Sequence, residues 1–184
     1  MIFPIVAYGD PVLKKRAEEI SERYLELDAL IDNMFQTMYA SNGVGLAAPQ
    51  VGLSIRLFIV DGAPFDDDEV RKFKEVFINA VIREESGQKW KFNEGCLSIP
   101  GVREDIHRKD EVYIEYYDRN WKFQKKKFDG LTARVIQHEY DHIEGVLFTD
   151  RISPLRRRLI QKRLSDISKG IVDVDYKMKF SHKK

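Results

Sequence analysis

The stretch VIQHEYDHIEGV, residues 135–146, holds two of the four histidines of the chain. Residues four apart lie on one face of a helix, so His138 and His142 would present both imidazoles in one direction. Glu139 follows His138 and is rotated by about 100° around the helix axis. This is the H-E-x-x-H pattern, in which two histidines bind a metal and a nearby carboxylate handles a proton. Because so short a pattern also arises by chance, it predicts a metal site only if the chain supplies a third ligand.

The residues around this motif predict that its helix is covered by other elements. The helix is expected from about Leu131 to Ile143, with Gly145 as its stop. Leu131 and Val135 share a face with the two histidines, so the imidazoles are expected to point inward.

Strand-like segments lie before the motif. Apolar runs begin at Ile55 and Val76, with an exposed insertion at 62–75 between them. Residues 111–128 alternate on both sides of Asp118-Arg119-Asn120, which indicates a hairpin. An earlier helix ending at Asn42-Gly43 is predicted by apolar residues at helical spacing, namely Leu27, Leu30, Ile31, Met34, Phe35, Met38 and Tyr39.

After the motif, Ser153-Pro154 should open another helix that stops near Gly170, and residues 171–180 alternate as a last strand. The predicted class is α+β. Mixed and antiparallel sheets would pack around a central metal-binding helix, with an N-terminal helix and a C-terminal helix followed by a strand. No repeat or second domain is seen, so residues 1–184 are predicted to form a single domain.

Composition narrows the possible partners and compartment. The 184 residues are 43% hydrophobic, which suits one compact domain with a core. The formal net charge is +1, so no overall electrostatic field favours binding to DNA or to a membrane surface. The start of the chain lacks the features of a secretory signal, and no apolar run is long enough to span a bilayer. Cys96 is the single cysteine, which excludes an internal disulfide and fits a reducing cytoplasm.

The usual third ligands of H-E-x-x-H proteases are missing. Catalytic zinc sites keep three protein ligands and one open position. Phe148 stands where one protease group has its third histidine, and no glutamate follows Glu144. His107 and His182 lie in charged surroundings and are expected to be solvated surface residues.

Cys96 is the better third ligand. It lies in NEGCLSIPG, residues 93–101, and a thiolate is a soft ligand for zinc or iron. A lone cysteine is most simply a small buried hydrophobe. The absence of the usual partners of H-E-x-x-H reverses that preference here.

A third segment, GVGLAAPQVG at 43–52, offers a tight backbone, little bulk and the amide of Gln50. By itself it is a weak signal, since it also fits a packing loop after the first helix. It lacks the Lys-Ser/Thr of a phosphate loop and the strand-before, helix-after context of a dinucleotide site. Such a segment suits docking of an extended peptide beside a metal.

Together the three segments resemble the peptide deformylase family. GVGLAAPQ, EGCLS and QHEYDH match the three motifs of that family in order, and the opening IVAYGDPVLKKRAEEI also looks like its N-terminal segment. The resemblance covers roughly residues 5 to 150. It implies a bacterial, cytoplasmic hydrolase that removes the formyl group from the N-terminal methionine of new proteins and releases formate.

The resemblance also implies residue roles. Cys96, His138 and His142 would bind one Fe2+, for which Zn2+, Ni2+ or Co2+ can substitute, and the metal would activate a water molecule. Glu139 would move the protons. The developing oxyanion would be stabilised by the Gln50 side chain and the Leu97 backbone N–H.

Further positions are expected along the substrate cleft by the same resemblance, namely Val44, Gly45, Leu46, Glu94 and Gly95. Glu94 is expected to pair with Arg103. Arg134 falls where the family often has an apolar residue, which leaves the lining of the methionine pocket open.

In some members of the family the C-terminal helix contacts the ribosome, and the basic run from Leu155 raises that possibility here. The default interpretation of this basic run is a solvated helix face. A monomer is favoured.

Two other classes of function stay open at this point. An H-E-x-x-H metallopeptidase would cut internal peptide bonds, and the missing third histidine or glutamate argues against it. A non-catalytic protein with a structural metal would need a fourth protein ligand, and the chain offers three good ones. A metal-free helix with a few polar residues is the simplest alternative.

Overall fold

A computed structural model describes residues 1–181 of the chain, so His182 lies outside the described residues. Its main sheet is antiparallel and five-stranded, and neighbouring strands follow one another in chain order. The strands are β2 (Gly45–Ala47), β3 (Leu57–Asp61), β4 (Lys74–Cys96), β5 (Ile99–Tyr117) and β6 (Phe123–Asp129).

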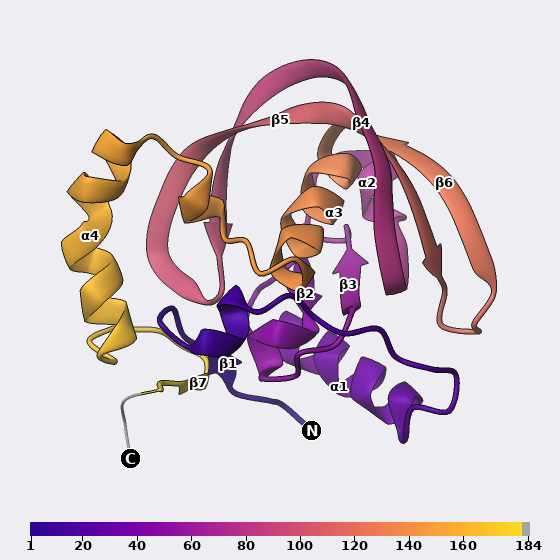
Figure 1. The fold of residues 1–184 in the computed structure, drawn as a ribbon, viewed down its shortest axis with the longest axis horizontal. Helices are drawn as coiled ribbons and strands as arrows, with labels where there is room; N and C mark the ends of the chain where they lie inside the picture. Colours follow the sequence, from indigo (N-terminus) through magenta and orange to yellow (C-terminus); the bar gives the residue numbers. More distant parts are fainter. Residues whose placement is uncertain (182–184) are drawn as a thin grey trace.

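The β4–β5 hairpin is the largest feature of the fold. Register shifts interrupt its ladder at four places, between Ile78 and Val81, Ile82 and Glu84, Ser86 and Lys89, and Gly95 and Cys96. Each irregularity bends a strand and increases its twist. The hairpin therefore curves into an arch over the third helix (Figure 1), and its tip ends at Cys96 and Leu97.

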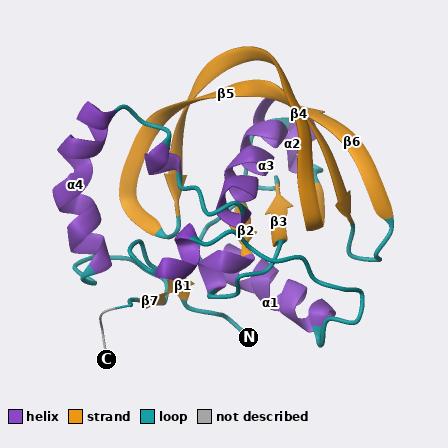
Figure 2. Ribbon diagram, viewed as in Figure 1, coloured by secondary structure: helices purple, strands orange, loops and turns teal. Residues whose placement is uncertain are grey.

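Helix α3 (Gly130–Ile143) lies under this arch and contacts β2, β3, β5 and β6 (Figure 2). Its apolar residues Ala133 and Ile136 join a buried cluster with Phe58, Phe77 and Val112 of the sheet. Buried apolar surface stabilises by about 25 cal/mol per Å², so this cluster fixes the helix against the sheet. Gly145, at φ +74°, follows the helix in the left-handed conformation of a C-terminal stop.

Helix α1 (Leu27–Ala40) packs on another apolar cluster, with Met34 and Met38 against Leu46 of β2 and Ile59 of β3. Short 3-10 turns η1 (Pro11–Lys14), η2 (Ala48–Val51) and η3 (Phe148–Asp150) connect the larger elements. The turn η2 directly follows β2 and carries Gln50.

The C-terminal part adds helix α4 (Pro154–Ser168) and a two-residue strand. The Ser153 side chain caps α4 by accepting a hydrogen bond from the Arg156 N–H. Leu164 and Ile167 attach the helix to a third buried cluster, which includes Ile99 and Phe148. Beyond α4 the chain returns, and β7 (Met178–Lys179) pairs in parallel with β1 (Ile5–Val6).

The predicted α+β class, the helices at both ends and the hairpin around Asp118 are confirmed. The strands predicted from Val76 and near 111 are much longer than expected. The insertion at 62–75 holds a short helix, α2 (Asp68–Arg71), and the predicted strand at 171–180 is wrong except at Met178–Lys179. No helix among residues 1–181 is long and apolar enough to cross a membrane.

Candidate active site

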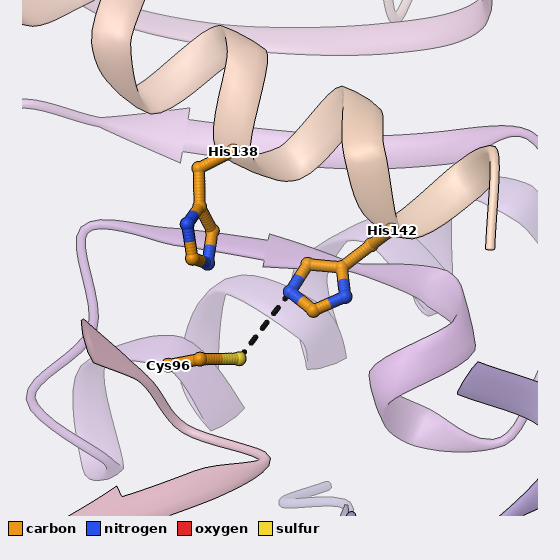
Figure 3. Close-up of side chains that lie close together, drawn as sticks. All are labelled: Cys96, His138 and His142. Carbon is orange, nitrogen blue, oxygen red and sulfur yellow. Dashed lines mark hydrogen bonds between the residues drawn. The ribbon is translucent and has the colours of Figure 1, made fainter. Parts of the chain in front are cut away.

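Cys96, His138 and His142 meet under the arch. One ligand atom from each residue lies within 4.8 Å of the other two. Cys96 comes from the end of β4, and both imidazoles leave the same side of α3 toward its sulfur (Figure 3). The Cys96 Sγ lies 3.3 Å from Nε2 of His142. A thiolate and two imidazoles form a donor set that suits zinc or iron.

Glu94 orients His138 within this set. Its Oε2 lies 3.0 Å from Nδ1 of His138, which leaves Nε2 of that ring for a metal. Arg108 holds Glu94 with two hydrogen bonds of 2.7 and 2.9 Å. Burial opposes the charged carboxylate, but hydrogen bonds from His138 and Arg108 hold the pKa of Glu94 well below its usual range. Glu94 is therefore an anionic anchor for the His138 ring.

The expected pairing of Glu94 with Arg103 is wrong. Arg103 donates instead to the side chain of Asn93 at 2.8 Å and to its carbonyl oxygen at 2.5 Å. The reason is the alternation of side chains along a strand. Glu94 is buried on the inner face of the hairpin and Arg103 is exposed on the outer face, whereas Arg108 lies on the inner face.

The two imidazoles differ electrostatically. Burial and the neighbouring His138 hold the pKa of His142 well below its ordinary value. Burial acts in the same direction on His138, but hydrogen bonds to Cys96 and Glu94 raise the pKa of that ring well above its ordinary value. His142 is thus already in the neutral form that binds metal, whereas His138 would release a proton on binding.

Glu139 lies beside the ligands with its carboxylate buried. Its Oε2 has no hydrogen-bond partner among the described residues. Burial raises the pKa of Glu139 to about 7. Gly45 makes this arrangement possible, because a Cβ at that position would lie 2.4 Å from Oε1 of Glu139. A carboxylate with a raised pKa and an unused oxygen is suited to accept and return a proton.

Gln50 and Leu97 flank the sulfur of Cys96. The side-chain oxygen Oε1 of Gln50 accepts a hydrogen bond from the Ala47 N–H at 2.9 Å. This contact directs the side-chain nitrogen Nε2 of Gln50 toward Cys96 Sγ, which lies 3.4 Å away. Leu97 occupies the turn that follows Cys96. The Gln50 amide can therefore donate to a group that lies beside the sulfur.

A cleft of about 590 Å³ opens onto these residues. Val44, Gly45, Glu94 and Gly95 line it as expected, but Leu46 does not. Leu46 is the middle residue of β2, so its side chain points to the opposite face and is fully buried against α1. The expected place of Leu46 along the cleft is therefore wrong.

Arg134 also lines the cleft, although its side chain is only 2% exposed. Its guanidinium lies 4.5 Å from the centroid of the Trp90 ring and donates to Glu94 Oε1 at 2.9 Å. A cation thus forms part of the cleft wall, between the Trp90 ring and Glu94.

The sequence reasoning missed several residues of the cleft and its support. Phe65 of the insertion and residues 174–176 line the cleft, and Arg108 holds Glu94. Val102 and Ile106 are apolar residues at even spacing, and Arg108 continues that series, which is a signal that could have marked Arg108 as inward-facing. The remaining candidate histidine, His107, is exposed as predicted.

The fold and the three convergent ligands define a candidate metallohydrolase. A family model described as polypeptide deformylase matches residues 2–158. A peptide deformylase of Christiangramia forsetii is 55% identical over 100% of this chain and 98% of that protein. One of Cytophaga hutchinsonii is 54% identical over the full length of both chains. The crystal structure of a peptide deformylase from Legionella pneumophila superposes with a TM-score of 0.80 at 36% identity, covering 93% of this chain and 98% of that one.

The chain belongs to the peptide deformylase family. Members are metalloenzymes that remove the N-formyl group from formyl-methionine at the start of nascent peptides. These findings support deformylation over cleavage of internal peptide bonds.

Proposed function

We propose that Cys96, His138 and His142 hold one metal ion and that deformylation takes place beside it, with Glu139 moving the protons. The observation that carries this proposal is the meeting of the three ligand atoms within 4.8 Å, next to a buried carboxylate whose Oε2 has no partner among residues 1–181. A bound divalent metal would supply Lewis-acid activation of water near neutral pH. Comparing formate release from formyl-methionyl peptides with cleavage of acetyl-methionyl peptides tests the proposal.

Glu139 acts at both ends of the reaction. Its carboxylate accepts a proton from the attacking water and later delivers it to the leaving nitrogen of methionine. The C–N bond of the formamide breaks, and the products are formate and a free amino terminus. A cation bound by Cys96, His138 and His142 would favour the ionised form of Glu139, the form that accepts a proton.

Two N–H donors stabilise the negative charge that develops on the formyl oxygen. Gln50 contributes its side-chain amide, and Leu97 contributes its backbone N–H. Donors that are already in place need no rearrangement during the reaction, and each is typically worth about 3 kcal/mol in the transition state. The hydrogen bond from Ala47 to Gln50 supports such a fixed donor.

The crowding of the site favours a formyl group over larger acyl groups. The carbon of a formyl group carries only hydrogen, whereas an acetyl group adds a methyl. Gly45 lies against Glu139 with no room for an added methyl at its Cα. Arg134 and Phe92, which line the cleft near His138, would bound the methionine side chain.

We further propose Fe2+ as the metal in the cell, with Zn2+, Ni2+ or Co2+ able to substitute. The thiolate of Cys96 and the two imidazoles suit each of these ions. The enzyme is proposed to act in the cytoplasm as a monomeric, single-domain protein.

The iron-loaded enzyme should lose activity in air or peroxide faster than the nickel-loaded enzyme. Thiolate and ferrous iron can both be oxidised. In the nickel-loaded enzyme only the thiolate remains sensitive to oxidation. Activity is followed over time in both preparations, with anaerobic samples as controls. Equal rates of decay would count against iron.

Helix α4 is a candidate contact for the ribosome, since its basic residues suit an anionic surface. Arg156 and Arg157 are paired with Glu104 and Asp150, so replacing them would also leave these carboxylates without their partners. Arg158 and Lys162 are exposed, and the described part of the chain shows no ion pair for either. Arg158→Glu with Lys162→Glu should therefore abolish co-sedimentation with ribosomes at low salt while deformylation of free peptides persists. Unchanged co-sedimentation of the double variant, like that of a Lys109→Glu control on β5, would refute this contact.

A further inference from the structure

The segment after α4 returns to the cleft. Residues 171–181 lie beyond the part of the chain that the family model matches, which ends at residue 158. The segment is attached to the N-terminal strand, where the N–H groups of Ile5 and Ala7 donate to the carbonyl oxygens of Lys177 and Lys179 at 2.8 and 2.9 Å. Figure 1 shows it passing beside the tip of the β4–β5 hairpin. The C-terminal segment is therefore fixed where the two hairpin strands meet.

Three residues of this segment, Val174, Asp175 and Tyr176, form part of the cleft wall. The ring of Tyr176 is half-buried and packs against the apolar cluster of α1. Its hydroxyl donates a hydrogen bond of 2.8 Å to the carbonyl oxygen of Leu97, 79 positions earlier in the chain. The contact joins the C-terminal segment directly to the residue that follows Cys96.

The turn that carries Leu97 is held from several sides. The N–H of Tyr8 donates to the Ser98 carbonyl oxygen at 2.8 Å, and the Gln50 amide nitrogen lies 3.4 Å from the Ser98 hydroxyl. The Tyr176 hydroxyl fixes the carbonyl of Leu97 itself. The Leu97 carbonyl lies in the peptide plane shared with Ser98, whereas the Leu97 N–H lies in the plane shared with Cys96. The two planes meet at the Leu97 Cα, so fixing the first limits the orientations that the second can take.

We propose that Tyr176 is a positioning residue for deformylation, holding the Leu97 turn so that the Leu97 N–H faces the formyl oxygen. The inference rests on the proposed role of the Leu97 N–H. Within residues 1–181, Tyr176 makes no hydrogen bond to Cys96, His138 or His142, and its hydroxyl donates to the Leu97 carbonyl instead. Its hydroxyl acts through the backbone of Leu97, from the carbonyl across the Cα to the N–H, and the C-terminal segment thus becomes part of the catalytic architecture.

Tyr176→Phe removes the hydroxyl and keeps the ring in the apolar cluster. We expect kcat to fall about tenfold, less than the ~10²–10³-fold loss when such a donor is removed outright. KM should stay within about twofold, because the contact matters mainly in the transition state. Metal content and melting temperature should match the wild type. In metal-free protein, the amide resonance of Leu97 should shift in a ¹H–¹⁵N spectrum.

Tyr116→Phe is the matched control. The Tyr116 hydroxyl also donates a hydrogen bond, to a carboxylate oxygen of Glu75 at 3.1 Å, but neither residue lines the cleft. It should change neither kcat nor the Leu97 resonance. Wild-type kcat in Tyr176→Phe, or a loss explained by lower metal content or stability, would overturn the inference. Failure of the proposed site would look different, because Glu139→Ala would then stay active whatever Tyr176→Phe does.

Discussion

Glu139→Ala is expected to keep its metal and its melting temperature but to lose about 10³–10⁴-fold or more in kcat. General acid–base contributions are typically about 10²–10⁴-fold, and this residue serves both proton transfers. The fold should tolerate the change, because Oε2 of Glu139 makes no hydrogen bond within the described residues. The loss should appear in kcat more than in KM, since substrate contacts remain.

Glu139→Gln is the matched variant for this prediction. It preserves the shape of the side chain beside Gly45 and removes only the ability to accept a proton. It should be as inactive as the alanine variant. A residue with a merely structural role would give the opposite pattern, with a lower melting temperature and full activity in the folded fraction.

Cys96→Ala is expected to bind metal far more weakly while the fold stays largely intact. Two histidines remain, but the anionic ligand is lost. Replacing an outer-shell partner typically costs about 10–100-fold in metal affinity, and loss of a direct ligand should exceed that range. Metal bound per chain is measured after dialysis at known free metal concentration, together with the melting temperature.

His107→Ala is the control for the thiolate variant. His107 is an exposed histidine of β5 outside the cleft, and its removal should leave metal content unchanged. Full occupancy in Cys96→Ala would mean that Cys96 is not the third ligand.

The helix of the motif was predictable because its signal is local. Helical spacing placed both histidines on one face, and the structure has that helix at Gly130–Ile143. The proximity of Cys96 to this helix is a long-range contact, and no periodicity predicts it. It was inferred from the missing protease ligands and from the order of the three motifs.

The extent of the β4–β5 hairpin was not predictable from alternation. Residues 83–91 are mostly exposed or half-buried on both faces, and the bulges break the period of two. The pairing of Glu94 with Arg108, 14 positions apart, depends on that register. The sequence alone therefore suggested Arg103, which is closer along the chain but lies on the other face.

The wall formed by residues 174–176 depends on tertiary contacts alone. Alternation in the C-terminal segment predicts a strand, yet within the described residues only Met178–Lys179 forms strand pairing, with β1. The preceding residues are held by side-chain contacts such as that of Tyr176 with Leu97. Such contacts leave no mark in the local pattern.

Formate release from a formyl-methionyl peptide tests the central claim most directly, measured together with metal content on one anaerobic preparation. The proposed site predicts turnover that rises in proportion to bound metal up to one ion per chain. It also predicts no hydrolysis of the matching acetyl-methionyl peptide, and loss of nearly all turnover in metal-loaded Glu139→Ala. Formate release by the metal-free protein would contradict it. Release by Glu139→Ala at even about a third of the wild-type rate would also contradict it, because a loss of about 10³-fold or more is expected.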